Sequence, residues 1–329
     1  MNQPQVRLPA CVLECRSLLQ SYGSAFGRSD LFTSISKADS PQHRLERVAA
    51  FYLSQLKCMK PTRAALKPYN PTLGEIFVSK WPVESKTESP VFFLAEQVPC
   101  FLHGKRDSWH LIFSLKVSHH PPVSAVYAEC RSAGIFYYGS LATIAGLKCK
   151  YLVWPDVMTV ENRGQATMVL VQHDEHFTFT FPRAEACDLL GSRPWLQLAG
   201  ETTLTASTGA SATFSFSGKD MVEGKLLTED GDVVATFAGS WRGQVDLEEK
   251  ESGRKRVLLD MNQWKGGEVG MEVAPVACQE ENESRRLWRK LTKALLHEPN
   301  KADEEKANIE NLARRRHSEE KYMPRFFEV

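Results

Sequence analysis

The apolar positions near the N-terminus follow a helical spacing in two stretches. Residues 9–22 favour a helix, and residues 40–57 carry a stronger form of the same pattern. Ser40 and Pro41 have the residue types of a helix N-cap and a first helical position. The apolar positions are Val12, Leu13, Leu18 and Leu19 in the first stretch, and Leu45, Val48, Ala49, Tyr52 and Leu53 in the second.

From Ile76 onward the pattern changes to short runs rich in Val, Phe, Tyr and Thr, separated by turn residues. This spacing predicts consecutive β-strands with no helices between them, and Glu229-Asp230-Gly231 predicts a hairpin. An antiparallel sheet of so many strands closes or nearly closes on itself and leaves a cavity that suits an apolar ligand. The clearest runs are 91–94, 135–138, 168–171, 177–181, 212–216, 225–227 and 233–237.

After Met261 the pattern becomes helical again. Residues 281–298 predict an amphipathic helix, Pro299 ends it, and residues 302–321 predict a highly charged helix. The apolar positions of the amphipathic helix are Leu287, Trp288, Leu291, Ala294 and Leu295. The three parts together predict an α+β fold, mainly β, with helices at both ends of a large antiparallel sheet.

Composition narrows the function classes. The chain has 329 residues and a formal net charge of +1, which argues against a generally cationic nucleic-acid binder. We find no run of 18 apolar residues and no signal peptide at the N-terminus, so we expect a cytoplasmic protein. The eight cysteines show no metal-like spacing and are expected to be reduced. They lie at positions 11, 15, 58, 100, 130, 149, 187 and 278.

Two adjacent histidines, His119 and His120, stand directly before Pro121 and Pro122. Each proline fixes its own φ and keeps the residue before it out of the helical region, so both rings sit on stiff, non-helical backbone. Such a pair is a metal half-site, an anion-binding pair or two polar residues at a turn. The short segment alone does not distinguish these.

Two further groups of polar residues have regular spacing. Lys67 and Asn70 stand in a segment with two Xaa-Pro pairs and a glycine, which we expect to be an extended, rigid loop. Lys306, Glu310 and Arg314 are spaced by four in the charged helix, so they share one face. Taken alone, the first group is typical of a surface loop and the second of a solvated ladder of ion pairs.

Three separated motifs together resemble the lipid-binding domain of the oxysterol-binding protein family: KPYNPTLGE at 67–75, VSHHPP at 117–122 and K-x3-E-x3-R at 306–314. The resemblance covers nearly the whole chain and implies a single domain over 1–329, as in short family members. It implies an incomplete, many-stranded antiparallel β-barrel around an apolar lipid tunnel, with N-terminal and C-terminal helices. Proteins of this family exchange phosphatidylinositol 4-phosphate for a second lipid, such as a sterol or phosphatidylserine, between membranes.

By motif position, the resemblance assigns the lipid headgroup to seven residues. The histidines are expected to bind the 4-phosphate, and the two lysines and the arginine to meet phosphate oxygens. The asparagine and the glutamate are expected to hydrogen-bond the phosphates and the inositol ring. Burial of several phosphate charges requires rigidly held cations, which agrees with this assignment. The seven residues are Lys67, Asn70, His119, His120, Lys306, Glu310 and Arg314.

The second motif departs from the family pattern, which usually reads EQVSHHPP. Here Leu115-Lys116 precede Val117, while Glu96-Gln97-Val98 lie upstream. Deletion of residues 99–117 restores the family pattern, so our hypothesis is an insertion within the signature, from a retained intron or a gene-model error. The alternative is a natural loop elaboration. Sequencing of the transcript across codons 90–125 distinguishes the two.

Two alternative functions stay open at this point. One is a phosphoinositide or sterol sensor that binds without net transport, and another is a metal enzyme that uses His119 and His120 with His173 and His176. Those four histidines lack the carboxylate of an HExxH frame. We expect no enzyme activity, cofactor, metal or nucleic acid, and a monomer that touches membranes peripherally and transiently. Few residues precede Leu8-Pro9, so we do not expect a full lid over the tunnel mouth. The identity of the second lipid is also open.

Overall fold

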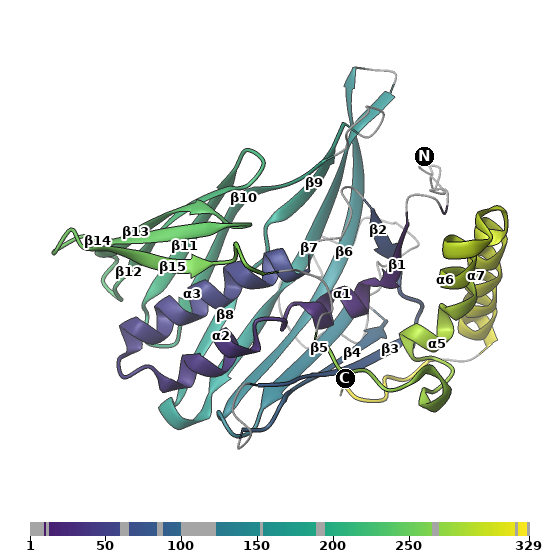
Figure 1. Ribbon diagram of the computed structural model, residues 1–329, viewed down its shortest axis with the longest axis horizontal. Coiled ribbons are helices and arrows are strands. Elements are labelled where there is room, and N and C mark those ends of the chain that lie inside the picture. Colours follow the sequence, from purple (N-terminus) through teal and green to yellow (C-terminus); the bar gives the residue numbers. More distant parts are fainter. Residues whose placement is uncertain are drawn as a thin grey trace.

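A single antiparallel sheet of 13 strands takes up most of the computed structural model of the chain (Figure 1). The structure describes residue 10 and residues 13–59, 66–83, 88–99, 123–151, 154–188, 195–264, 270–319 and 322–327. In chain order the strands are β3 (Ile76–Trp81), β4 (Val91–Val98), β5 (Val123–Cys130), β6 (Ile135–Tyr151), β7 (Trp154–Leu170), β8 (Glu175–Phe179), β9 (Arg183–Cys187), β10 (Trp195–Ala206), β11 (Ser211–Ser217), β12 (Met221–Leu227), β13 (Val233–Ser240), β14 (Gln244–Glu249) and β15 (Lys255–Asp260).

Strands that follow one another in sequence are mostly neighbours in the sheet, which runs from β15 to β3 with β9 paired to β7 and β10. Burial alternates along the strands, as Ala212, Phe214 and Phe216 of β11 show, because one face of the sheet covers the core. Among the described residues β3 and β15 do not pair with each other, so the sheet curves without closing. The predicted many-stranded antiparallel sheet is confirmed, as is the hairpin, since β12 pairs with β13.

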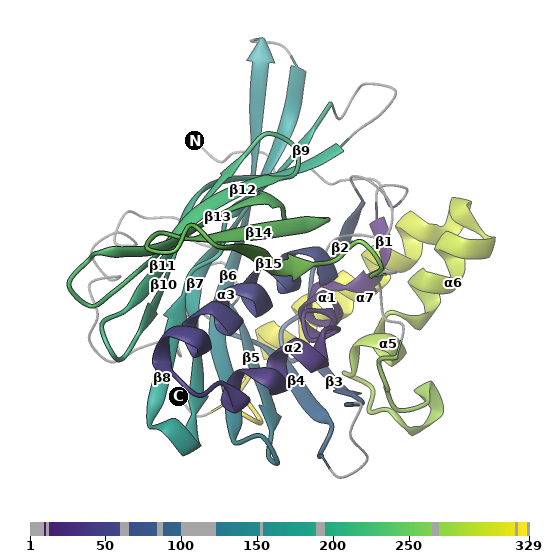
Figure 2. The same cartoon turned by 60° about the vertical axis from the view of Figure 1, so that its left-hand side comes forward.

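Three N-terminal helices lie against the sheet: α1 (Leu18–Ser24), α2 (Ser29–Ser34) and α3 (Pro41–Cys58) (Figure 2). The predicted start of α3 is confirmed, because the Ser40 hydroxyl accepts a hydrogen bond from the His43 N–H at 3.2 Å. The apolar face of α3 joins the main core, and its Tyr52 hydroxyl lies 2.8 Å from the Thr202 hydroxyl of β10.

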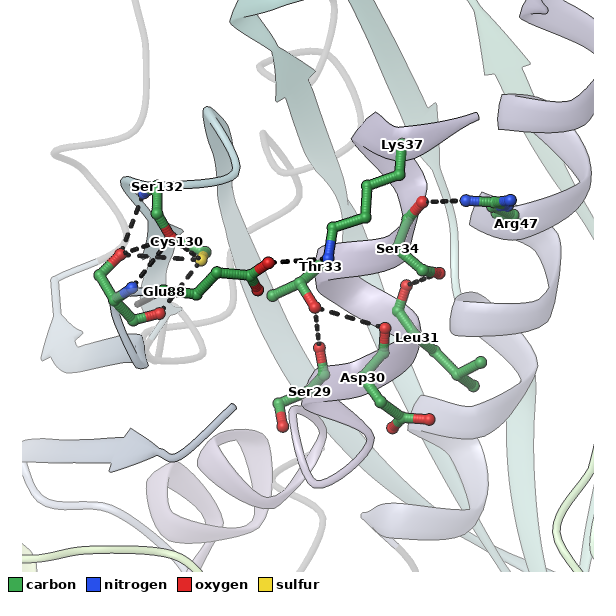
Figure 3. A network of polar contacts seen from close by, with 11 residues as sticks. Ser29, Asp30, Leu31, Thr33, Ser34, Lys37, Arg47, Glu88, Cys130 and Ser132 are labelled. Atoms are coloured by element: carbon green, nitrogen blue, oxygen red, sulfur yellow. Dashed lines mark hydrogen bonds and ion pairs between the residues drawn. The ribbon is translucent and has the colours of Figure 1, made fainter. Parts of the chain in front are cut away.

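Polar contacts fix α2 to its neighbours (Figure 3). Lys37, just after α2, forms an ion pair of 2.8 Å with Glu88, which precedes β4. Arg47 of α3 donates to the Ser34 carbonyl at the end of α2. The Lys37–Glu88 ion pair joins the segment after α2 to the β3–β4 connection. The Arg47–Ser34 hydrogen bond joins the end of α2 to α3.

The prediction of one helix over residues 9–22 is wrong for its first part. Leu13–Ser17 form a strand, β1, which pairs in parallel with β2 (Lys67–Tyr69) in a separate two-stranded sheet. The helix α1 begins only at Leu18, after Ser17, whose hydroxyl accepts from the Leu19 N–H. Backbone pairing with a distant segment outweighs the local helical pattern here, which a short apolar run cannot reveal.

The C-terminal part forms α5 (Ser284–Leu287), α6 (Arg289–His297) and α7 (Ala302–Glu319). The predicted single helix over 281–298 is therefore divided, because the backbone at Trp288 leaves helical geometry (φ −88°, ψ 4°). A second, small core holds these helices against β1 and β2. Its buried members are Ala10, Leu13, Tyr69, Trp288, Leu291, Ala294 and Ala302.

Two general features follow from the described part of the chain. None of its helices is both long enough and apolar enough to cross a bilayer. The cysteines described there, at positions 15, 58, 130, 187 and 278, are free thiols.

A buried ion pair joins the helical layer to the sheet. Arg44 of α3 donates to both carboxylate oxygens of Glu175 in β8, at 2.6 and 2.7 Å. Substitution Arg44→Met leaves Glu175 charged, buried and unpaired, so we expect the free energy of unfolding to fall by about 3–5 kcal/mol. Arg163→Met removes a half-exposed ion pair of 3.3 Å and should cost less than about 1 kcal/mol. Urea denaturation of both variants measures the difference, and equal losses would contradict it.

Candidate functional site

The structure brings together residues from the first and third predicted motifs. Lys67 lies at the start of β2, and Lys306 and Glu310 lie on successive turns of α7. The small core that packs α6 and α7 against β1 and β2 sets this arrangement, with Ile309 of α7 at its margin. All three polar side chains are half-buried.

The charge of Lys67 depends on both α7 residues. Burial is the main cause that lowers the pKa of the Lys67 ammonium, and the positive charge of Lys306 lowers this pKa further. The carboxylate of Glu310 acts in the opposite direction. Two cations and one anion are thus held within electrostatic reach, where partial burial weakens the screening by water.

Arg314 and Asn70 lie at the margin of this cluster. Arg314 is exposed on the next turn of α7, where it donates to Glu310 at 3.5 Å and to the Asn311 side chain at 3.1 Å. Asn70 is exposed directly after β2. Glu310 therefore stands between Lys306 and Arg314, as the spacing predicts.

His119 and His120 lie outside the described residues, and so do residues 100–117 of the proposed insertion. The ends of the strands on either side are described: β4 ends at Val98, β5 begins at Val123, and these two residues are cross-strand partners. In the sequence, His120 stands three residues before Val123. Without 99–117, five residues would join β4 to β5, a common hairpin length.

The first motif is bonded to the strand that leads into the second. The Gly74 N–H donates to the Gln97 carbonyl at 2.9 Å, and the Gln97 N–H donates to the Glu75 carbonyl at 2.9 Å. Gly74 has φ +78°, and an added Cβ would lie 2.8 Å from the ring of Tyr322. Glycine is therefore required for its backbone and for the close approach of the C-terminal segment.

Glu75, the last residue of the first motif, has a role that the sequence did not indicate. One carboxylate oxygen accepts from the hydroxyls of Ser17 and Ser284, and the other accepts from the Trp288 indole N–H at 2.8 Å and the Thr72 N–H at 3.0 Å. Burial raises the pKa of Glu75, while these four hydrogen bonds act in the opposite direction. The side chain joins β1, the motif loop and α5, and so positions Lys67 and α7.

Glu96, which the insertion hypothesis assigns to the second motif, contacts the C-terminal segment. It accepts from the Tyr322 hydroxyl, from the Arg325 N–H at 2.8 Å and from the Phe326 N–H at 3.0 Å. Phe327 packs on the apolar group formed by Val98, Val123 and Ala125 at the strand ends. The last described residues thus cover the end of β4 and the start of β5.

A small cavity lies between the N-terminal helices and the sheet. It has a volume of about 10 Å³, and five of its eleven lining residues are aromatic. That volume is close to the smallest that holds one water molecule, so the lipid tunnel that the resemblance implies stays a prediction. The rings belong to Tyr22, Phe26, Phe93, Tyr137 and Phe181.

The second histidine pair, His173 and His176, lies apart from the motif residues in the sequence. A ring nitrogen of His173 lies 2.8 Å from the Ser36 carbonyl, and His176 is exposed. Across the part of the chain that the structure describes, no three His, Cys, Asp or Glu side chains are grouped as metal ligands would be.

Comparisons with known proteins agree with the motifs. A family model described as oxysterol-binding protein matches residues 3–297. Human oxysterol-binding protein-related protein 9 is 34% identical over 302 residues, which cover 89% of this chain and 39% of the relative. Human oxysterol-binding protein-related protein 11 is 31% identical, over 95% of this chain and 44% of the relative. The chain thus spans less than half the length of these relatives.

Solved structures share the fold. The Osh3 ORD in complex with PI(4)P from Saccharomyces cerevisiae superposes with a TM-score of 0.72 at 19% identity, over 99% of this chain and 84% of that chain. The Osh1 ORD domain in complex with ergosterol gives a TM-score of 0.72 at 20% identity, over 98% of this chain and 79% of that chain.

Glu75 provides a test of how the site is held together. Glu75→Ala removes the acceptor of the Ser17 hydroxyl, the Trp288 indole N–H and the Thr72 N–H, and leaves the Ser284 hydroxyl only the Ile76 carbonyl at 3.2 Å. We expect a loss of about 3 kcal/mol or more in the free energy of unfolding. Glu75→Gln should cost less, because its carbonyl can serve Trp288 and Thr72 while the two serine hydroxyls turn to accept from its amide. The exposed Glu251→Ala is the control, with a change within about 0.5 kcal/mol. Equal unfolding midpoints for Glu75→Ala and the control would contradict this role.

The coupling among Lys67, Lys306 and Glu310 is also testable without a ligand. Lys306→Met removes a like charge and should raise the pKa of Lys67, whereas Glu310→Gln removes an opposite charge and should lower it further. NMR titration of isotope-labelled lysine measures both shifts, with Lys250→Met as a control that leaves the pKa of Lys67 unchanged. Shifts of the same sign in the two α7 variants would refute the arrangement.

Proposed function

The chain belongs to the oxysterol-binding protein family, and on that premise we propose that it binds membrane lipids one at a time and exchanges them between membranes. The proposed pair is phosphatidylinositol 4-phosphate and a second lipid, either a sterol or phosphatidylserine. The match covers 39% of the length of human oxysterol-binding protein-related protein 9. What a full-length protein of that size does is therefore also a matter of proposal for this chain.

The observation that carries the proposal is the half-buried cluster of Lys67, Lys306 and Glu310. Burial is the main cause that lowers the pKa of Lys67, and repulsion by the nearby Lys306 ammonium lowers it further. A bound phosphate removes this repulsion and gains charge-assisted hydrogen bonds. A headgroup with more than one phosphate also has room for Arg314, whose planar guanidinium suits two oxygens of one phosphate.

The remaining headgroup roles are proposed on the motif positions. We assign the 4-phosphate to His119 and His120, and hydrogen bonds to phosphate or ring hydroxyl groups to Asn70 and Glu310. The β4–β5 ends lie beside the first motif through the Gly74–Gln97 and Gln97–Glu75 hydrogen bonds, which supports a shared site. A structural neighbour holds PI(4)P in the same fold.

The apolar part of either lipid is proposed to enter the space between the helical layer and the sheet. Two neighbours of this fold hold ergosterol and cholesterol, which favours a sterol as the second lipid. The aromatic rings around the small cavity would have to move apart to admit it. This function involves no covalent chemistry, and we propose a protein that acts as a monomer in the cytoplasm and touches membranes transiently.

Paired histidine variants test the headgroup assignment. His119→Ala/His120→Ala should abolish phosphatidylinositol 4-phosphate extraction from vesicles and leave extraction of the second lipid largely intact. The reason is that only the 4-phosphate of the inositol ring loses its hydrogen-bond donors. His173→Ala/His176→Ala is the matched control and should change neither. Native mass spectrometry of the lipid bound after purification identifies the second ligand. Equal loss of both lipids in the first variant would count against the assignment.

A vesicle transfer assay separates exchange from sensing. Movement of the second lipid driven by a gradient of phosphatidylinositol 4-phosphate supports exchange. Binding of both lipids with no transfer would leave the sensor as the better description.

A further inference from the structure

The solvent face of α6 carries a concentration of positive charge that the headgroup site does not use. Residues 284–297 contain five arginines and lysines and no carboxylate, although the whole chain has a net charge of only +1. At 100° per residue, the positions on the outer face of α6 form one continuous surface. We call it the α6 basic face, and its members are Arg289, Lys290, Lys293, Leu296 and His297, all exposed.

The two sides of α6 differ in what they contact. Leu291 and Ala294 point inward and are buried in the small core that holds the helix on β1 and β2. On the outer side, Leu296 is 62% exposed, and the ion pair that Lys293 forms among the described residues is a long one, 4.0 Å to Glu298. Within the described part of the chain, Arg289 and Lys290 form no ion pair. Packing therefore explains the inner side alone.

We propose that the α6 basic face is a docking surface for an anionic lipid bilayer. Cations with an apolar side chain among them are typical of helices that lie at a membrane surface, where the charges meet lipid phosphates and the apolar group enters the interface. Leu296, which a purely electrostatic partner would not need, favours a bilayer over an acidic protein.

The position of α6 suits this role. Figure 1 places α5, α6 and α7 together at one edge of the molecule, beside the large sheet, and Figure 2 also shows α5 and α6 at the edge. The helix α6 contacts α7, which carries Lys306 and Glu310. A bilayer on the α6 basic face would therefore lie one helix away from the headgroup cluster. This inference rests on the proposed function for its ligand, but its surface is separate from the headgroup residues.

Charge reversal tests the docking surface. Arg289→Glu/Lys290→Glu should weaken flotation with vesicles of phosphatidylcholine and phosphatidylglycerol about tenfold or more, and should leave the weak binding to pure phosphatidylcholine unchanged. The matched control is Lys250→Glu/Arg254→Glu, which makes the same change of net charge at the exposed β14–β15 turn. That turn carries acidic neighbours and lies away from α6 (Figure 1). The effect should decrease as salt is added.

The outcomes separate this inference from the proposed function. Binding of a water-soluble, short-chain phosphatidylinositol 4-phosphate without vesicles should be equal in wild type and Arg289→Glu/Lys290→Glu. Unchanged vesicle binding in that variant, equal loss in the control, or no preference of wild type for anionic vesicles would overturn the docking surface. If wild type binds no short-chain lipid but the tenfold difference on vesicles persists, the proposed function fails and the docking surface stands.

Discussion

The buried carboxylate of Glu75 is the constraint on which the arrangement of the site depends. Its four donors come from sequence separations of 3, 58, 209 and 213 residues, so one side chain joins the N-terminal strand, the motif loop and the C-terminal helices. A carboxylate with no water around it is costly unless each lone pair has a donor. The elements that supply these donors are therefore held to one relative position, and that position brings Lys67 to α7.

The parts of the fold that the sequence predicts are those with local causes. Ser40 caps α3, and the apolar period of that helix needs no distant partner. The strands are separated by turns, so their number and antiparallel order follow the chain. Leu13–Ser17 forms a strand instead of the predicted helix because its partner, Lys67–Tyr69, lies far along the chain and brings the backbone bonds that decide its conformation.

The same distinction applies to the site. The spacing of Lys306, Glu310 and Arg314 predicts one helix face, which the structure has, but spacing cannot show which face of which helix meets Lys67. The proximity of Lys67 to α7 depends on α6. Its inner side chains Leu291 and Ala294 belong to the small core that packs α7 near β2. The role of Glu75 was not predicted for the same reason. Its neighbours in sequence are typical of the end of a loop, and three of its four donors lie 58 or more residues away along the chain.

The two concentrations of positive charge differ in a way that bears on how a lipid would be handled. At the proposed headgroup site, partial burial lowers the pKa of Lys67, so charge is held there at a cost that a phosphate would relieve. On the α6 basic face the cations are exposed, and their attraction for a bilayer is weak for each group and sensitive to salt. Partly buried charge suits selection of one headgroup, whereas exposed charge suits brief attachment to a surface. A protein that must leave a membrane with its lipid needs the first to persist while the second releases, and placing the two on separate faces of the α6–α7 pair permits both.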